Sequence, residues 1–449
     1  MKKHNPYILS GSISKGVLSL SAPIVFTMFF HSLLNIVDTF WVGKISALAV
    51  AAVSISWPIV FILIALAAGI STGANALVAR FVGSKDLPSA SLAAKNSIYI
   101  GVTLSLILTV FGLLLLKPLF IFLGASGELL SEALSYARIF FYGTIFHVIM
   151  FIFGSILRGE GDTKTPMRIG VAINVVNMIL DPLFILVLGL GVAGAALATT
   201  ISAIIGCVFY LRYILADKAI VKIDFKKLEF SKKLSYEVLF IGVPASLRNV
   251  VNAIGVFFTI KVVAVYGAAA VAAYGIAFRV ESFGVLPVVA IALATMTMVG
   301  QNLGAENFSR AKTSGWISAS LGAGLMAGFG LLVFAFASEI VKIFNTETEV
   351  VRIGAEVLKI KSPAFLFSAL IMSLGSAFQA FGKSHYSLII TILRVTLMLI
   401  LIYWFNDLYG LVGVWWGIVL SGVLSGLINL IWYLLYNPKK TSKTLGNLL

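Results

Sequence analysis

Only three acidic side chains lie well inside the long apolar segments of this sequence, namely Asp38, Asp181 and Glu281. An ionisable group in a hydrocarbon environment is unfavourable, so such residues mark functional sites by default. Asn177 precedes Asp181 by four residues, and on a helix the two side chains would share one face. Carboxylate and amide oxygens suit a hard cation such as Na⁺, or a bound proton, rather than a soft transition metal.

The depth of these residues in a membrane groups them with one more polar side chain. At 1.5 Å per helical residue, Asn177 and Asp181 would lie about 15 Å and about 21 Å from the inner end of their helix. Thr199 would lie roughly 12 Å below the outer face on the next helix, and Asp38 lies near the outer end of the first long apolar segment. We therefore predict a cation-coupling site from these four residues, with Na⁺ or H⁺ as the coupling ion. The alternative is that each acid is a hydrogen-bonded group that stabilises helix packing.

The first long apolar segment carries polar residues at steps of three or four, which places them on one stripe of a helix. This stripe consists of Pro23, Thr27, His31, Asn35 and Asp38. His31 is a candidate proton relay or drug contact, with a packing histidine as the alternative. Trp41 and Tyr136 either line a cavity or belong to the aromatic belt at the membrane interface. The residues considered for a substrate cavity are Met28, His31, Asn35, Trp41, Tyr136 and Asn174.

Glu281 has a different setting from the other two acids. Arg279 lies two residues away, and Arg248 and Lys261 lie on the preceding apolar segment. A buried carboxylate with basic side chains nearby favours an ion pair that holds helices together. We predict a structural ion pair between Glu281 and one of these three residues, with a functional role as the alternative.

The composition excludes a soluble protein. Of the 449 residues, 60% are apolar and 11% are charged, and the mean hydropathy is +1.04, whereas a soluble domain is about 45–50% apolar and about 25% charged. The net charge of +15 comes from basic residues that border apolar segments, which indicates a membrane partner and excludes nucleic acid. The single cysteine, Cys207, rules out a disulfide framework within the chain.

Several kinds of catalytic motif are missing from the sequence. There is no phosphate-binding loop for ATP, no zinc-protease motif and no set of serine, histidine and aspartate that would serve an enzyme. We therefore expect a protein that is not an enzyme, needs no cofactor and draws its energy from an ion gradient. The segment RGEGDTKTP at 158–166 resembles a phosphate-binding turn but follows no strand. We interpret it as a cytoplasmic hairpin between two helices.

Twelve apolar runs are each long enough to cross a bilayer, which needs about 20 residues. The ten-residue alternation of a membrane barrel is absent. Most of the 33 Lys and Arg fall in loops on the side that also receives both termini, so the positive-inside rule places both termini in the cytoplasm. We expect a multi-pass protein of the plasma membrane.

The sequence repeats itself at a constant spacing of 221 residues, which we call the repeat offset. This shift superposes Pro23 on Pro244, and it also superposes Gly83 on Gly304, Gly154 on Gly375, Gly161 on Gly382 and Gly189 on Gly410. Parallel repeats of this kind are a transporter architecture. The predicted fold is therefore an all-α polytopic membrane protein of twelve transmembrane helices in two pseudo-symmetric six-helix lobes. The predicted domains are a lobe at 1–216, a cytoplasmic linker at 217–233 and a lobe at 234–449.

The repeat does not extend to the buried acids, since Asp38 maps onto Thr259 and Asp181 onto Ile402. The symmetry of the fold therefore does not require these carboxylates, which favours a functional role for them. The basic linker is interpreted as a tether; the alternatives are a helix on the membrane surface and a lipid-binding switch.

Four motifs together resemble one family. They are NIVDTFWVG at 35–43, LRGEGDTKTP at 157–166, the N-x-x-x-D-P pattern from Asn177 to Pro182, and VGQNLGA at 299–305. The chain resembles, over essentially its whole length, the multidrug and toxic compound extrusion (MATE) antiporters. NorM-like members carry an aspartate on the tenth helix, where this sequence has only Glu356 near the outer end. It is more similar to the DinF-like branch, including archaeal members.

The resemblance implies a V-shaped central cavity and the export of amphipathic, often cationic drugs or toxins in exchange for H⁺ or Na⁺. Asp38, Asn177, Asp181 and Thr199 match the first-lobe cation-site positions of such members, and Pro23 matches a proline linked to bending of the first helix. Membrane lipids are the other expected partners, and we expect a monomer. The alternative function is a flippase for lipids or lipid-linked oligosaccharides, for which several basic residues facing the cavity would be needed; the first lobe has only Arg138 within its spans.

Overall fold

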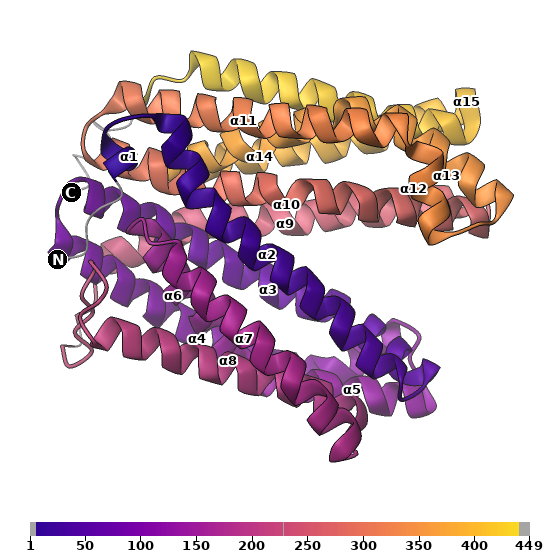
Figure 1. Cartoon of the computed structure of the whole chain (residues 1–449), viewed down its shortest axis with the longest axis horizontal. Coiled ribbons are helices and arrows are strands. Elements are labelled where there is room, and N and C mark those ends of the chain that lie inside the picture. The colour runs from indigo at the N-terminus through magenta and orange to yellow at the C-terminus, as the bar shows by residue number, and fades with distance from the viewer. Residues whose placement is uncertain (1–5, 228, 440–449) are drawn as a thin grey trace. The chain divides into compact units, whose positions relative to one another are not determined.

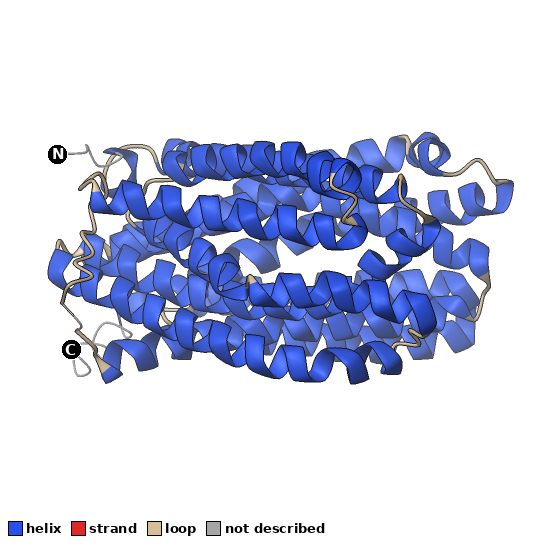
Figure 2. Cartoon of the chain, turned by 90° about the horizontal axis from the view of Figure 1, so that it is seen from below, coloured by secondary structure: helices blue, strands red, loops and turns tan. Residues whose placement is uncertain are grey.

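Helices form all of the regular secondary structure that the computed structural model describes, over residues 6–227 and 229–439, and no strand occurs in these ranges (Figure 2). The two termini, predicted to be cytoplasmic, lie outside the described residues. In a bilayer core the backbone finds no water to bond, so apolar runs of this length satisfy their N–H and C=O groups internally as helices.

The first half of the chain forms helices α1 to α8, labelled in chain order in Figure 1. They are α1 (Pro6–Leu9), α2 (Ile13–Gly43), α3 (Ala47–Gly83), α4 (Leu87–Phe122), α5 (Gly127–Tyr142), α6 (Thr144–Gly159), α7 (Lys164–Pro182), the π-helical turn η1 (Leu183–Val187) and α8 (Gly191–Leu215). The second half has α9 (Lys232–Ala264), α10 (Ala268–Gly304), α11 (Phe308–Ala335), α12 (Ala337–Phe344), α13 (Thr348–Lys361), the 3₁₀ turn η2 (Ser362–Ala364), α14 (Phe365–Ala380) and α15 (Ser384–Leu435).

Ten segments of the described chain are single helices, or helices joined by a short turn, long and apolar enough to cross a bilayer. The pair α5 and α6, bent by 50°, makes an eleventh span. The 52 residues of α15 would extend about 78 Å, more than twice the hydrocarbon thickness of about 30 Å. Gly410 divides them, because its φ of 59° and ψ of −142° lie outside the helical region. The resulting twelve spans confirm the predicted all-α, twelve-helix fold.

Gly410 also supports the sequence repeat. Its counterpart Gly189 has a φ of 66° and ends the turn between α7 and α8. Both glycines have a positive φ, which is strained for residues with a Cβ. The repeat offset thus relates two backbone breaks as well as two sequences.

The described chain divides into two compact units. The first is Ala22–Ser246, and the second combines Pro6–Ser21 with Leu247–Leu449, of which residues up to 439 are described. The division therefore falls inside α2 and inside α9, whereas the sequence-based division placed it in the linker. Pro23 and Pro244, which are related by the repeat offset, each lie within three residues of it.

The linker between α8 and α9 contains no helix in the part that the structure describes. Its apolar residues Ala219, Val221 and Ile223 are buried, while lysines between and beside them are exposed. The backbone N–H groups of Ile220 and Val221 both donate to Glu160 Oε2 at 2.9 Å. The linker is thus held against the first unit along its length.

Candidate functional site

The predicted coupling residues come together on three helices of the first unit, with Asp38 on α2, Asn177 and Asp181 on α7, and Thr199 on α8. We call these four residues the acid cluster. With its amide oriented to suit its neighbours, Asn177 donates to Asp38 Oδ1 at 3.2 Å and accepts from the backbone N–H of Thr199 at 3.1 Å. The Thr199 hydroxyl donates to the Ala195 carbonyl at 3.0 Å, as is common inside helices.

Asp181 is the most deeply buried member of the acid cluster. Its side chain is 0% exposed, and among the described residues no donor group gives a hydrogen bond to either carboxylate oxygen; its polar partner is the carboxyl group of Asp38. Asp38 is half-buried and lies close enough for each carboxyl to influence the charge of the other. A buried carboxylate that has neither a donor group nor a cation beside it is strongly unfavourable as an anion. This arrangement therefore calls for a proton or a bound cation.

The position of Asp181 follows from the local sequence. Pro182, directly after it, lacks an N–H group, and the chain continues as the π-helical turn η1, a feature that often occurs at functional sites. Gly194 on α8 lets that helix approach the turn closely. A Cβ at Gly194 would lie 2.7 Å from the backbone of Phe184. A helix end, a proline and a glycine thus place Asp181 beside α8.

The predicted cavity residues have different environments. His31, which is exposed, lies beside Asn174 and within electrostatic range of Asp38, and Tyr136 lies within range of both acids. Trp41 and Tyr136 pack against the same apolar group of the first unit. For the other two residues of the set, the structure gives only their exposure and one hydrogen bond. Asn35 is exposed, and its backbone carbonyl accepts from the Thr39 hydroxyl, while Met28 is half-buried.

Glu281 has a partner that differs from the predicted ones. Its Oε2 lies 2.7 Å from Nζ of Lys361, at the end of α13. Of the three predicted partners, Arg248 donates instead to the Ser387 hydroxyl at 3.2 Å, and Lys261 and Arg279 are exposed. The prediction of an ion pair stands, but its partner was wrong because Lys361 reaches Glu281 from a helix far along the chain.

The hairpin at 158–166 has a structural role that the sequence did not reveal. Asp162 accepts from the backbone N–H of Thr165 at 3.0 Å and from its hydroxyl at 2.7 Å, which stabilises the start of α7. Tyr213 on α8 donates to the same carboxylate at 3.1 Å. Glu160 accepts two further hydrogen bonds from the linker. The hairpin between α6 and α7 is therefore bonded both to α8 and to the linker.

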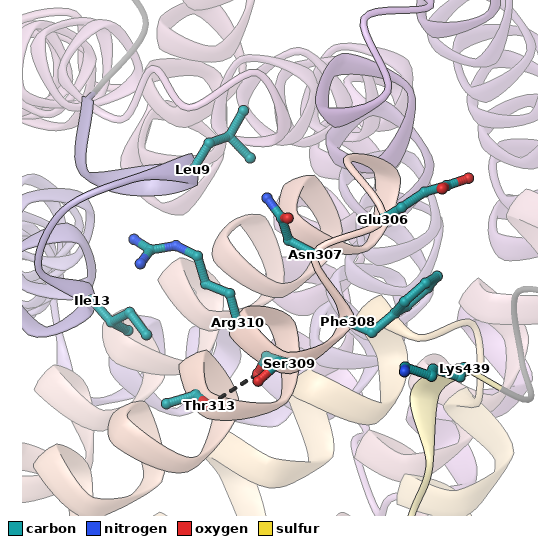
Figure 3. Close-up of a pocket in the computed structure, with 9 residues that line it drawn as sticks. All are labelled: Leu9, Ile13, Glu306, Asn307, Phe308, Ser309, Arg310, Thr313 and Lys439. Carbon is teal, nitrogen blue, oxygen red and sulfur yellow. Dashed lines mark hydrogen bonds between the residues drawn. The ribbon is translucent and has the colours of Figure 1, made fainter.

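A pocket of about 910 Å³ lies in the second unit, at the junction of α10 and α11 (Figure 3). Arg310 on its wall is engaged in other contacts: its guanidinium donates four hydrogen bonds, each to the carbonyl of a different residue in the segment before α2. These are Tyr7, Ile8, Ser10 and Gly11. The pocket contains none of the predicted coupling or cavity residues, and Arg310 serves to hold the segment before α2 in the second unit.

The sequence profile of the MatE family matches the chain twice, at residues 23–183 and 244–404. The second match begins and ends at the repeat offset from the first, so that Pro23 and Pro244 are the first residues of the two matches. The two matches cover most of the chain.

The chain belongs to the MatE family.

Curated and solved MatE-type proteins resemble it along its whole length. The multidrug export protein MepA of Staphylococcus aureus is 26% identical over 440 residues, covering 98% of this chain and 97% of MepA. A crystal structure of a MATE transporter in a bent conformation has a TM-score of 0.93 at 28% identity, covering 99% of both chains. A MOP superfamily transporter from Pyrococcus furiosus, described as having a binding pocket of reverse polarity, has a TM-score of 0.90 at 28% identity over 96% of this chain and 98% of its own.

Membership of the MatE family makes this chain a multi-pass membrane transporter and not an enzyme. The family resemblance predicted from four short motifs is thereby confirmed. The similarity to solved twelve-helix transporters also agrees with the number of spans in the structure.

Proposed function

We propose that this protein is a secondary antiporter that exports amphipathic, often cationic drugs in exchange for H⁺ or Na⁺ by alternating access. The observation that carries the proposal is the buried carboxyl group of Asp181, which receives no hydrogen bond from a donor group among the described residues and whose polar partner is a second carboxyl group, that of Asp38. The export of multiple drugs is supported by the similarity to MepA. The position of both acids in the first half supports the DinF-like branch.

Coupling requires the cation and the drug to favour different states of the transporter, because a ligand shifts an equilibrium only by its differential affinity. A proton or Na⁺ at the acid cluster neutralises the carboxylates and weakens the attraction for a cationic drug. Release of that cation restores the negative charge and favours binding of the next drug molecule. The two ligands thus compete through charge, whether or not they touch the same atoms.

The helix that carries Asp38 is suited to transmit this change. Its first residues belong to the second unit and the rest to the first, and Pro23 lies at the division. Proline removes one helical hydrogen bond, and the carbonyl of Pro23 accepts from the Thr27 hydroxyl at 2.9 Å. We therefore assign the conformational switch to Pro23. The proposal includes a monomer in the plasma membrane, surrounded by lipid, with both termini in the cytoplasm.

The test is transport by purified protein in liposomes under an imposed pH or Na⁺ gradient, with a cationic dye as cargo. Wild-type protein should move dye against the cation flux, and Asp38→Asn/Asp181→Asn should not. Glu128→Gln, which alters an exposed acid in the first turn of α5, is the matched control and should transport normally. Antiport at the wild-type rate by the double variant would remove the coupling site from the first unit.

A further inference from the structure

A second group of polar side chains lies among the helices of the second unit. Besides the ion pair of Glu281 with Lys361, the Lys361 ammonium lies 5.6 Å from the centre of the Tyr274 ring, and that ring stacks on Trp415 at 5.9 Å. Arg394 on α15 lies within electrostatic range of both members of the pair. It donates from Nη2 to the side-chain oxygen of Asn252 on α9 at 2.6 Å. We call these residues the basic cluster: Asn252, Tyr274, Glu281, Lys361, Arg394 and Trp415.

The basic cluster has more positive charge and more donors than its acceptors can satisfy. Lys361 and Arg394 carry two positive charges, and Glu281 offsets one of them. Arg394 enters no ion pair in the part of the chain that the structure describes, and the group it donates to there is a neutral amide. The indole N–H of Trp415, 0% exposed, likewise has no acceptor among the described residues. A guanidinium has five N–H donors in a planar fork, so most of the fork of Arg394 remains for a ligand.

The cluster is also accessible to a ligand. The Glu281 side chain is 23% exposed, and Arg394 and Asn252 are half-buried, whereas the Lys361 side chain is 8% exposed. The ion pair therefore lies at the border between the packed interior of the unit and its surface. A ligand would meet Arg394 and Glu281 before it met Lys361.

The chemistry here is unlike that of the acid cluster. At the repeat offset, Asp38, Asn177 and Asp181 are replaced by Thr259, Met398 and Ile402. Thr259 donates to the Gly255 carbonyl at 2.9 Å and touches the Met398 sulfur at 4.0 Å, and all three side chains are buried. These positions offer no carboxylate for a cation, whereas the basic cluster carries a net positive charge.

We propose that the basic cluster recognises a carboxylate carried by an amphipathic cargo molecule. Arg394 would hold the two carboxylate oxygens through its planar fork, a geometry that guanidinium groups favour. Lys361, kept in place by Glu281, would add positive charge. The inference rests on the proposed export of amphipathic molecules, and it adds that those which also bear a carboxylate bind more tightly than those which do not.

The experiment compares two fluorescent dyes that differ only at this group: a rhodamine with a free benzoate and its methyl ester. Binding is measured with purified protein in lipid nanodiscs without any gradient. Wild-type protein should bind the acid about tenfold or more tightly than the ester, since charge-assisted hydrogen bonds are stronger than neutral ones. Arg394→Gln should abolish that preference by weakening acid binding alone. Equal binding of both dyes by the wild type would overturn the inference.

Two controls keep the result interpretable. Arg248→Gln removes an arginine on α9 that contacts Ser387 and lies outside the cluster, and the preference should persist. If Arg394→Gln does not fold, sodium benzoate added to wild-type protein decides the question. It should displace the acid dye at concentrations at which benzamide does not, and equal displacement by both would contradict the inference.

The two proposals can fail separately. Equal binding of both dyes by wild-type protein that still shows cation-driven transport would refute only the carboxylate site. Wild-type antiport by Asp38→Asn/Asp181→Asn, with the dye preference unchanged, would refute only the coupling site. The Asp38→Asn/Asp181→Asn protein should retain the preference for the acid dye in nanodiscs, because it retains every residue of the basic cluster.

Discussion

The two halves of this transporter share one fold but bury opposite chemistry at equivalent positions. In the first unit, Asp181 is buried next to a second acid, Asp38, and receives no hydrogen bond from a donor group within the described chain. In the second unit, its counterpart Ile402 is 0% exposed and belongs to the main apolar core. The repeat offset relates glycines, prolines and helix ends but not these polar residues. The residues that determine helix packing are thus repeated, whereas the buried acids distinguish the two halves.

A second contrast concerns how each unit satisfies its buried charge. In the second unit the carboxylate of Glu281 forms an ion pair with the ammonium group of Lys361, which lies 2.7 Å away. The acid cluster has no such side chain among its described neighbours, apart from His31 within electrostatic range of Asp38. An ion pair between two side chains suits a permanent structural contact. Two acids without a basic side chain as partner suit the reversible binding of a proton or cation. The predictions below are ordered from the largest expected effect to the smallest.

The largest effect should come from making the first unit resemble the second. Asp38→Thr and Asp181→Ile, alone or together, should each reduce cation-driven dye export to the level of protein-free liposomes. The two changes should be non-additive, because both acids belong to one interacting group. Initial transport rates of the singles and the double measure this. A double variant that is much worse than either single would show two independent sites.

Breaking the ion pair of the second unit should chiefly affect stability. Glu281→Gln leaves the Lys361 ammonium, 8% exposed, without its partner, at a cost of about 3 kcal/mol. We expect a clear fall in the thermal unfolding temperature in detergent, with cation-driven export retained by the folded fraction. Glu281→Gln/Lys361→Met should recover part of the loss. A stable Glu281→Gln protein that binds dye but has lost exchange would assign Glu281 to coupling.

Adding an acid to the second unit should be less harmful but still measurable. Thr259→Asp places a carboxyl next to Met398 in an apolar environment, where it stays protonated and destabilises the protein by about 1–3 kcal/mol. Thr259→Val should have a smaller effect, since it introduces no charged group and the 2.9 Å bond that the hydroxyl donates is to the Gly255 carbonyl of its own helix. Thermal unfolding of both variants gives the comparison. Equal stability of Thr259→Asp and wild type would mean that the second unit tolerates an acid at this position.

The fold was predictable because it depends on local properties of the sequence. Runs of about 20 apolar residues predict spans irrespective of their partners, and the glycines at 189 and 410 mark breaks that only glycine readily adopts. The division of α2 and α9 between the compact units was not predictable. Apolar residues on either side of Pro23 carry no sign of the unit against which they pack.

The acid cluster was predictable from residue spacing within a helix, which does not reveal the ion pair of Glu281 and Lys361. Asn177 and Asp181 are four residues apart, so helix geometry relates them directly, and the lack of an acid at the repeat positions of Asp38 and Asp181 set the two acids apart. Glu281 and Lys361 are related only through the tertiary packing of α10 and α13. Sequence spacing identifies contacts within a helix, whereas contacts between distant helices need the structure.

The smallest effect should come from the ion pair that ties the linker to the first unit, in contrast to the pair in the second. Lys95 Nζ lies 2.8 Å from Glu229 Oε2, nearly the distance found for Lys361 and Glu281, but the Glu229 side chain is 54% exposed. The hydrogen bond and charge of Lys95 lower the pKa of Glu229 below its ordinary value. The contribution of this ion pair to stability is therefore complete above the ordinary glutamate pKa of about 4.3 and is lost as the pH falls through the lowered value.

Glu229→Gln should leave the unfolding temperature at pH 7 within the error of measurement, because water competes for an exposed pair. Any difference from the wild type should shrink further below about pH 4. A fall at pH 7 as large as that of Glu281→Gln would show that the linker, and not only the helices, stabilises the first unit.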